Sequence, residues 1–155
     1  MKPQNAIMIK KITACDYEAL ATLRHKSWPQ DSISAHHKDI TALFDKDRPP
    51  YAGRAGFIAY DDSYAVGFIE LSLRPYVNGC LDSPVGFIEG LYCAPDYDKE
   101  ALSLSFISKA TTWAKDNGAR ELATDTYLEN TIAQQDHQRW GFQATEKIVY
   151  FRKKL

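Results

Sequence analysis

The chain has 155 residues, 45% of them hydrophobic and 25% charged, and its formal net charge at pH 7 is −1. This length and balance predict a single globular domain over residues 1–155. The chain has no block of Lys and Arg residues, which argues against a nucleic-acid partner. It also has no apolar run of the roughly 18 residues that are needed to cross a membrane. The three cysteines form no C-x-x-C pair, so we expect reduced thiols in a cytoplasmic protein.

The first third of the chain predicts one strand, two helices and two loops. Thr13 or Asp16 provides a helix N-cap, and Tyr17, Leu20 and Leu23 then fall on one helical face. The predicted elements are a half-buried strand over 6–12, a helix ending near residue 28, a polar loop over 29–34, a helix over about 36–44 and a loop over 45–56.

The rest of the chain predicts a mixed sheet. Asp61, Asp62 and Ser63 form the turn of a hairpin, and Asn117-Gly118 supplies the left-handed residue that ends a helix. The predicted elements are strands over 56–60 and 65–74, a loop over 75–84, a strand over 85–93, a helix through 102–113, a short strand over 121–126, a helix over 130–140 and a final strand over 147–152. This order predicts an α+β domain.

Residues 85–113 contain the strand and helix around which we expect the other elements to be arranged. The first nine of these residues read as a buried strand, which Glu89 and Gly90 interrupt. A carboxylate in such a strand must face a polar group, and a glycine there indicates a bulge or a closely approaching ligand. A helix follows with four apolar residues on one face, namely Leu102, Phe106, Ala110 and Trp113. Its N-terminus is a natural site for an anion.

The order of elements, together with a set of short motifs, resembles the GNAT N-acetyltransferase superfamily and, within it, the chromosomal type of aminoglycoside 6′-N-acetyltransferase. The motifs are Ser27-Trp28-Pro29, Tyr76-Val77-Asn78-Gly79, Ser83-Pro84-Val85, Phe87-Ile88-Glu89-Gly90, Thr124-Asp125-Thr126, Glu129-Asn130-Thr131-Ile132, Gly141-Phe142 and Thr145-Glu146-Lys147. The resemblance covers nearly the whole chain. It implies the GNAT fold, a mixed and mostly antiparallel sheet with splayed central strands flanked by helices.

The resemblance also implies two ligands and no metal. Acetyl-CoA would lie between strands 85–93 and 121–126, and an aminoglycoside or related polyamine would lie beside it. The implied cofactor-binding residues are Leu91, Tyr92, Cys93, Lys99, Ala101, Leu102, Ser103 and Asn130. The implied substrate-binding residues are Trp28, Asp31, Tyr76, Glu89, Asp125 and Glu146. Carboxylates suit the ammonium groups of an aminoglycoside, and aromatic rings suit its sugar faces.

The chemistry that the resemblance implies is direct acetyl transfer to the 6′-amine. This amine must lose a proton before it attacks, and we expect Asp125 to accept it with help from Glu89. A backbone N–H of Leu91 or Tyr92 would polarise the thioester carbonyl. Many GNAT enzymes place a Tyr acid four residues before the Gly-Phe pair, and His137 stands at that position here.

One segment departs from the family. The family's pyrophosphate loop reads Arg/Gln-x-x-Gly-x-Gly/Ala, whereas residues 98–103 read Asp-Lys-Glu-Ala-Leu-Ser. Asp98 and Glu100 therefore stand where a dianion should bind, and Ala101 replaces the glycine. This departure favours one alternative, a GNAT-fold protein that binds a cationic amine or aminoglycoside without acetylating it. A separate alternative is an enzyme acting on another small amine or polyamine, because cationic pockets look alike in sequence.

Simpler structural roles stand beside these assignments. Glu89 could pair with Arg74, and Trp28 could be a core residue at a helix end. Asp125 could cap a strand, Glu146 could be a surface acid, and Asn130 could be an N-cap. The exposed strand 148–152 could pair across a two-fold axis, and the resemblance likewise implies a homodimer.

Overall fold

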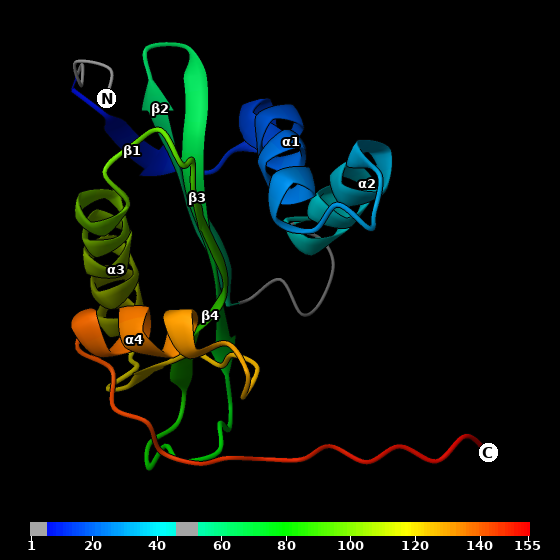
Figure 1. The fold of residues 1–155 in the computed structure, drawn as a ribbon, viewed down its shortest axis with the longest axis vertical. Coiled ribbons are helices and arrows are strands. Elements are labelled where there is room, and N and C mark those ends of the chain that lie inside the picture. The colour runs from blue at the N-terminus through cyan, green and yellow to red at the C-terminus, as the bar shows by residue number, and fades with distance from the viewer. Residues whose placement is uncertain (1–5, 46–52) are drawn as a thin grey trace.

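The computed structural model describes residues 6–45 and 53–155. Figure 1 shows a sheet seen edge-on, with helices on both sides. The elements are β1 (Met8–Lys11), a short 3-10 turn η1 (Ala14–Asp16), α1 (Tyr17–Ser27), α2 (Ile33–Leu43), β2 (Arg54–Asp61), β3 (Tyr64–Arg74), β4 (Val85–Cys93), α3 (Lys99–Asp116), β5 (Leu122–Ala123) and α4 (Thr131–Arg139).

The sheet has the strand order β1-β2-β3-β4-β5. The first four strands are antiparallel neighbours, and β5 is parallel to β4. Helices α1 and α2 cover one face, and α3 and α4 lie on the other (Figure 1). The predicted α+β class with a mixed, mostly antiparallel sheet is thus confirmed.

Each face of the sheet has its own apolar cluster. Phe68 of β3 packs with Leu20 and Leu23 of α1 on one side. The next residue, Ile69, packs with Phe106 of α3 on the other. Because successive side chains of a strand point to opposite faces, one strand contributes to both layers of the core.

The central strand and its following helix agree with the prediction. Strand β4 has the predicted bounds, and three of the four residues on the predicted apolar face of α3, Leu102, Phe106 and Ala110, are buried. Gly118 has φ +82° at the end of this helix, a left-handed conformation that glycine adopts without steric cost. The hairpin of β2 and β3 is also confirmed.

Two boundaries near the N-terminus differ from the prediction. Helix α2 begins at Ile33 instead of about residue 36, because the side chain of Ser32 caps it by accepting a hydrogen bond from the Ala35 amide at 3.1 Å. Strand β2 begins at Arg54, inside the predicted loop 45–56, because the pairing of β2 with β3 starts at Arg54, which lies opposite Ser72 of β3. Residues 46–52 of that loop lie outside the described residues.

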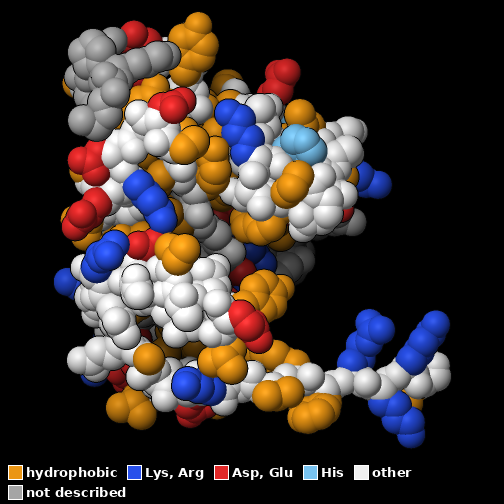
Figure 2. All heavy atoms as spheres, viewed as in Figure 1, with side chains coloured by type: hydrophobic (Ala, Val, Ile, Leu, Met, Phe, Trp, Pro, Cys, Tyr) orange, Lys and Arg blue, Asp and Glu red, His pale blue; other side chains and the backbone are white. Residues whose placement is uncertain are grey.

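Two predicted strands near the C-terminus are corrected. Only Leu122–Ala123 of the predicted strand 121–126 pairs with β4. Residues 147–152 form no strand, and the segment 143–155 carries no regular secondary structure. Figures 1 and 2 show its end extending away from the body. A strand needs a hydrogen-bonded neighbour, and this segment has none among the residues described.

Candidate functional site

A cavity opens where β4 and β5 separate. Their pairing consists of Gly86 with Leu122 and Phe87 with Ala123 and does not continue toward the C-terminal end of β4. Beyond this point lies a cavity of about 650 Å³. It is lined by residues 88–93, 95, 99, 124–126, 133, 136, 137 and 140. The lining therefore comes from β4, the start of α3, the segment after β5, and α4.

Seven of the predicted site residues line this cavity. They are Glu89, Leu91, Tyr92, Cys93, Lys99, Asp125 and His137. The tertiary structure thus brings together two of the predicted acids, the strand-end residues and the candidate proton donor from four separate segments. The remaining predicted residues lie around the cavity or away from it.

Glu89 occupies a β-bulge. Leu71 of β3 pairs with Ile88 and Glu70 pairs with Gly90, so Glu89 is the extra residue on β4. A bulge re-aims the side chain that it carries. The bulge predicted from Gly90 is therefore confirmed, and it lies at the cavity wall.

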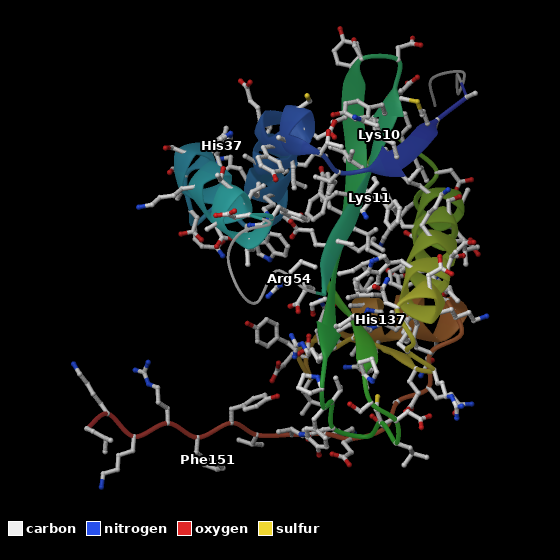
Figure 3. The ribbon with its side chains drawn as sticks, turned by 180° about the vertical axis from the view of Figure 1, so that it is seen from behind. Lys10, Lys11, His37, Arg54, His137 and Phe151 are labelled. Atoms are coloured by element: carbon white, nitrogen blue, oxygen red, sulfur yellow. The ribbon has the colours of Figure 1, made fainter. Side chains whose placement is uncertain are left out.

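The carboxylate of Glu89 is already paired within the protein. Arg74 Nη2 donates to both of its oxygens at 3.1 Å, and Ser72 Oγ donates to Oε1. Arg54, labelled in Figure 3, lies 3.9 Å away. Pairing with Arg74, the simpler role considered above, is confirmed. A carboxylate whose two oxygens are held by arginine and a hydroxyl has few lone pairs left for a ligand.

The group that closely approaches Gly90 is a side chain. A Cβ at Gly90 would lie 2.6 Å from Cη2 of Trp28. The indole also packs against Phe68, with ring centroids 6.1 Å apart. Trp28 is half-buried and contributes to the core beside α1. It therefore has the core role considered above, while its ring also reaches the cavity-lining bulge.

Three contacts missed by sequence reasoning fix the end of α1 near Trp28. The guanidinium of Arg24 bonds both oxygens of Glu70 at 2.7–3.1 Å, and its Nη1 bonds Asp39 at 2.6 Å. The buried ring of His36 lies 3.0 Å from the Trp28 carbonyl. These pairings join residues as far as 46 positions apart, so local patterns carry no signal of them.

Asp125 and His137 both line the cavity, Asp125 from the segment after β5 and His137 from α4. The structure records no hydrogen bond or ion pair for the Asp125 carboxylate among the described residues. His137 packs its ring edge-on against Trp140 at 5.3 Å, and Figure 3 shows it where α4 meets the strands. Burial lowers the pKa of His137, although Asp136 and Asp125 act in the opposite direction. A neutral imidazole is the favoured form near pH 7.

Cys93 is a packed thiol. Its Sγ lies 3.4 Å from the fully buried Oγ of Ser103. Burial raises the pKa of the Cys93 thiol, which favours the protonated form over a nucleophilic thiolate. The side chains of Leu102 and Ser103 are buried in the protein, so any contact of these two residues with a ligand would involve their backbone.

The start of α3 is capped by its own residues. Asp98 accepts a hydrogen bond from the Ala101 amide at 3.0 Å, and its carbonyl accepts one from the Leu102 amide. The ammonium of Lys99 lies 2.6 Å from Asp136 on α4. The strand-end side of the cavity fits an acyl thioester and its pantetheine arm, because the backbone of β4 lines it. The helix N-terminus fits a diphosphate poorly, because a carboxylate already occupies it.

The other predicted residues lie outside the cavity lining. Tyr76 is 70% exposed in the loop after β3, and Asp31 is exposed before α2. Asn130 caps α4 by accepting a hydrogen bond from the Ala133 amide at 3.1 Å, as the simpler role predicts. Glu146 is exposed in the C-terminal segment. Asp136 and Trp140 line the cavity and were not predicted, since helix 130–140 reads from sequence as mostly polar.

Two further observations bear on the kind of protein. Over residues 6–45 and 53–155, no helix combines the length and apolar character needed to cross a bilayer. Within the same residues, no group of three or more His, Cys, Asp or Glu side chains is arranged to hold a metal ion.

Comparison with known proteins identifies relatives over nearly the full length. The profile of the Acetyltransferase (GNAT) family matches residues 17–142. The aminoglycoside N(6′)-acetyltransferase type 1 of Salmonella enteritidis is 36% identical over 147 residues, 94% of this chain and 98% of that protein. The protein of the same description from Acinetobacter haemolyticus is 37% identical over 148 residues, 95% of this chain and 98% of that protein.

Solved structures agree. AAC(6′)-Iy in complex with the bisubstrate analog CoA-S-monomethyl-acetylneamine has a TM-score of 0.88 at 35% identity, covering 97% of this chain and 100% of that chain. AAC(6′)-Iy in complex with CoA has a TM-score of 0.89 at 34% identity, covering 100% and 99%. The five-stranded sheet with its flanking helices is thus the GNAT fold, and the chain belongs to the GNAT acetyltransferase family.

Proposed function

We propose that the chain transfers an acetyl group from acetyl-CoA to a primary amine, the 6′-amine of an aminoglycoside. The observation that carries this proposal is the cavity at the divergence of β4 and β5, which is lined both by Asp125 and by the C-terminal residues of β4. Relatives at 36–37% identity that are described as aminoglycoside N(6′)-acetyltransferases support the choice of acceptor.

The charges of the cavity suit a cationic acceptor. Its lining includes three carboxylates, Glu89, Asp125 and Asp136, and one ammonium, Lys99. Glu89 and Asp136 are paired within the protein, which leaves Asp125 available to an incoming ammonium group. A carboxylate near a protonated amine attracts it and can then accept its proton.

The roles of the residues follow from these pairings. Acetyl-CoA supplies the thioester that the amine attacks. In this proposal Asp125 accepts the amine proton, directly or through water, and Glu89 contributes mainly charge because Arg74 holds both of its oxygens. Backbone N–H groups at Leu91 to Cys93 polarise the thioester carbonyl. His137 is retained only as a wall of the cavity, because a neutral imidazole is a weak proton donor.

A second candidate function has support from the start of α3. Asp98 caps this helix and Lys99 pairs with Asp136, so the protein could bind a cationic amine without using a nucleotide cofactor. The cavity does not by itself distinguish an aminoglycoside from another small amine or polyamine. One assay distinguishes both alternatives from acetyl transfer to an aminoglycoside.

The assay measures thiol release from acetyl-CoA in the presence of matched acceptors. We expect release with an aminoglycoside that carries a 6′-amine, such as tobramycin, and none with an aminoglycoside that carries a 6′-hydroxyl. Mass spectrometry and NMR of the product would locate the acetyl group. Equal turnover of both acceptors would reject 6′-transfer, and binding of tobramycin without thiol release would favour the second function. Faster turnover of a simple polyamine would change the substrate class.

We also propose that the chain forms a homodimer through its C-terminal segment. Val149, Tyr150 and Phe151 are 75%, 84% and 93% exposed, and Figure 3 shows Phe151 on the projecting segment. Water-exposed aromatic residues in an extended segment favour a partner surface. The segment leaves the body after Thr145. The side chain of Thr145 packs so closely on Gly79 that a Cβ added to Gly79 would clash with it.

The partner we propose is a second copy of the chain. Near the C-terminus, residues 124–126 of one predicted strand and all of 147–152 lack a paired strand among the described residues of one chain. β5 is an edge strand with only two paired residues. Addition of 147–152 from one copy to the β5 edge of the other would complete both strands in a reciprocal exchange.

A further inference from the structure

The α3 N-terminus differs from an anion site in a specific way. In such a site, free backbone N–H groups and the helix dipole face a phosphate. Here the Asp98 carboxylate accepts the hydrogen bond of the Ala101 amide at 3.0 Å. The protein's own anion therefore holds a position that a diphosphate would need.

The charges of the residues next to Asp98 also oppose the binding of a diphosphate. Glu100 adds a second carboxylate in the first turn of α3. The cation between them, Lys99, is bonded to Asp136 at 2.6 Å, and Asp136 is only 14% exposed. Lys99 is also the single Lys or Arg among the residues that line the cavity. A diphosphate would have to displace Asp98, break this ion pair and approach Glu100.

The other end of the cavity has none of these obstacles. Leu91, Tyr92 and Cys93 line it where β4 no longer pairs with β5. Unpaired strand backbone can bind the amides of a pantetheine arm as another strand would. The two halves of an acyl-CoA thus meet very different surfaces: a fitting one for the thioester and arm, and an opposing one for the diphosphate.

We infer that this chain holds its acyl donor through the acyl-pantetheine arm, so that a pantetheine thioester without the nucleotide diphosphate serves nearly as well as acetyl-CoA. The inference rests on the proposed acetyl transfer. With either donor the amine nitrogen forms a bond to the acetyl carbon and the carbon–sulfur bond breaks. The protonated acceptor amine gives up two protons in all: one passes to the base before the attack, and the other leaves with the thiol. The nucleotide part of CoA forms or breaks no bond and carries no proton in this reaction.

Direct binding tests the inference without relying on turnover. Calorimetric titration of the full chain with CoA and with pantetheine gives two dissociation constants, and we expect them to differ by less than about tenfold. A preference for CoA of tenfold or more, or failure of both ligands to bind, would overturn the inference. We also expect added salt not to weaken CoA binding, since the one cation in the described cavity lining, Lys99, is already paired with Asp136. A marked weakening by salt would count against it.

A charge variant with a matched control locates the effect. Asp98→Asn keeps an N-cap residue and removes one negative charge. We expect it to tighten CoA binding about fivefold and leave pantetheine binding unchanged. Asp116→Asn makes the same charge change at the other end of α3 and should alter neither. Unchanged CoA binding in Asp98→Asn would overturn the account.

Turnover then separates this inference from the proposed function. Comparable kcat/KM values for acetyl-CoA and S-acetyl-pantetheine would support both. A strong preference for acetyl-CoA would overturn the donor inference while the acetyltransferase function stands. Absence of turnover with both donors would reject the acetyltransferase function, and with it the use of either thioester as a donor.

Discussion

The ring of Trp28 lies against the α-carbon of Gly90, and a Cβ added there would come within 2.6 Å of the indole. This contact joins the end of α1 to the bulge of β4 that carries Glu89. The glycine is therefore needed for close packing of a side chain, and the indole supports the bulge behind the cavity-lining residues Glu89 and Gly90. The contact links the core of one sheet face to the site.

Gly90→Ala tests this contact. We expect it to destabilise the fold by roughly 1–3 kcal/mol, because the new methyl group must push the indole aside. Urea unfolding measures the cost. In a Trp28→Ala background the same substitution should cost much less, since the opposing ring is gone. Equal costs in both backgrounds would show that the ring does not cause the strain.

Asp125→Asn and Glu89→Gln test the assignment of the base. Loss of a general base typically lowers turnover by about 10²–10⁴-fold, and we expect a loss of this size in Asp125→Asn. Glu89→Gln should cost less, because Arg74 already holds that carboxylate. Glu129→Gln removes an exposed acid from the same loop and serves as the control. If Asp125→Asn and Glu129→Gln had the same kcat, Asp125 would not be the base.

Glu70→Gln tests the buried pair that holds α1 on the sheet. It leaves the guanidinium of Arg24, 8% exposed, short of a charge partner. We expect a loss of about 3–5 kcal/mol in unfolding free energy. Asp39, the other charge partner of Arg24, has a side chain that is 57% exposed. Asp39→Asn should therefore lower the unfolding free energy by less than about 1 kcal/mol. Arg24→Met combined with Glu70→Leu should recover most of the loss, and failure to do so would reject the charge explanation.

His137 should make stability depend on pH. Because burial lowers its pKa in the folded protein, the unfolded chain binds a proton more tightly. Stability is therefore complete above the unfolded pKa of about 6.5 and falls as the pH decreases below it. Urea unfolding at about pH 7.5 and 5.5 should show this fall reduced in His137→Gln. His37→Gln, on an exposed face of α2, is the control and should keep the wild-type slope.

Light scattering tests the C-terminal exchange. We expect the full chain to have twice the 17.6 kDa mass of one copy. Deletion of residues 146–155, or Val149→Asp with Phe151→Asp, should give a monomer by removing the apolar contact. Tyr64→Asp changes a residue that is also 75% exposed, on the β2–β3 hairpin, and should leave the dimer intact. A monomeric full chain would contradict the proposal.

Periodicity and turn residues were enough to predict the elements that are complete within a short stretch. The bounds of β4, the apolar face of α3, the hairpin and the Asn130 cap follow from neighbouring residues, because strands, helices and caps are governed by contacts a few positions apart. The bulge at Glu89 was also predictable, since a carboxylate and a glycine interrupt an apolar run.

The sequence by itself thus determined the fold class and the order of elements as far as α4, and it named Glu89 and Asp125, two acids that line the cavity. The tertiary structure decided which of those acids is available. Glu89 meets Arg74 across a bulge, Lys99 meets Asp136 from another helix, and Asp125 keeps its carboxylate unengaged among the described residues. It also decided that residues 147–152 pair with no strand over the described residues 6–45 and 53–155. Charge pairing and strand pairing join residues distant in sequence, so their outcome depends on where the fold places each partner.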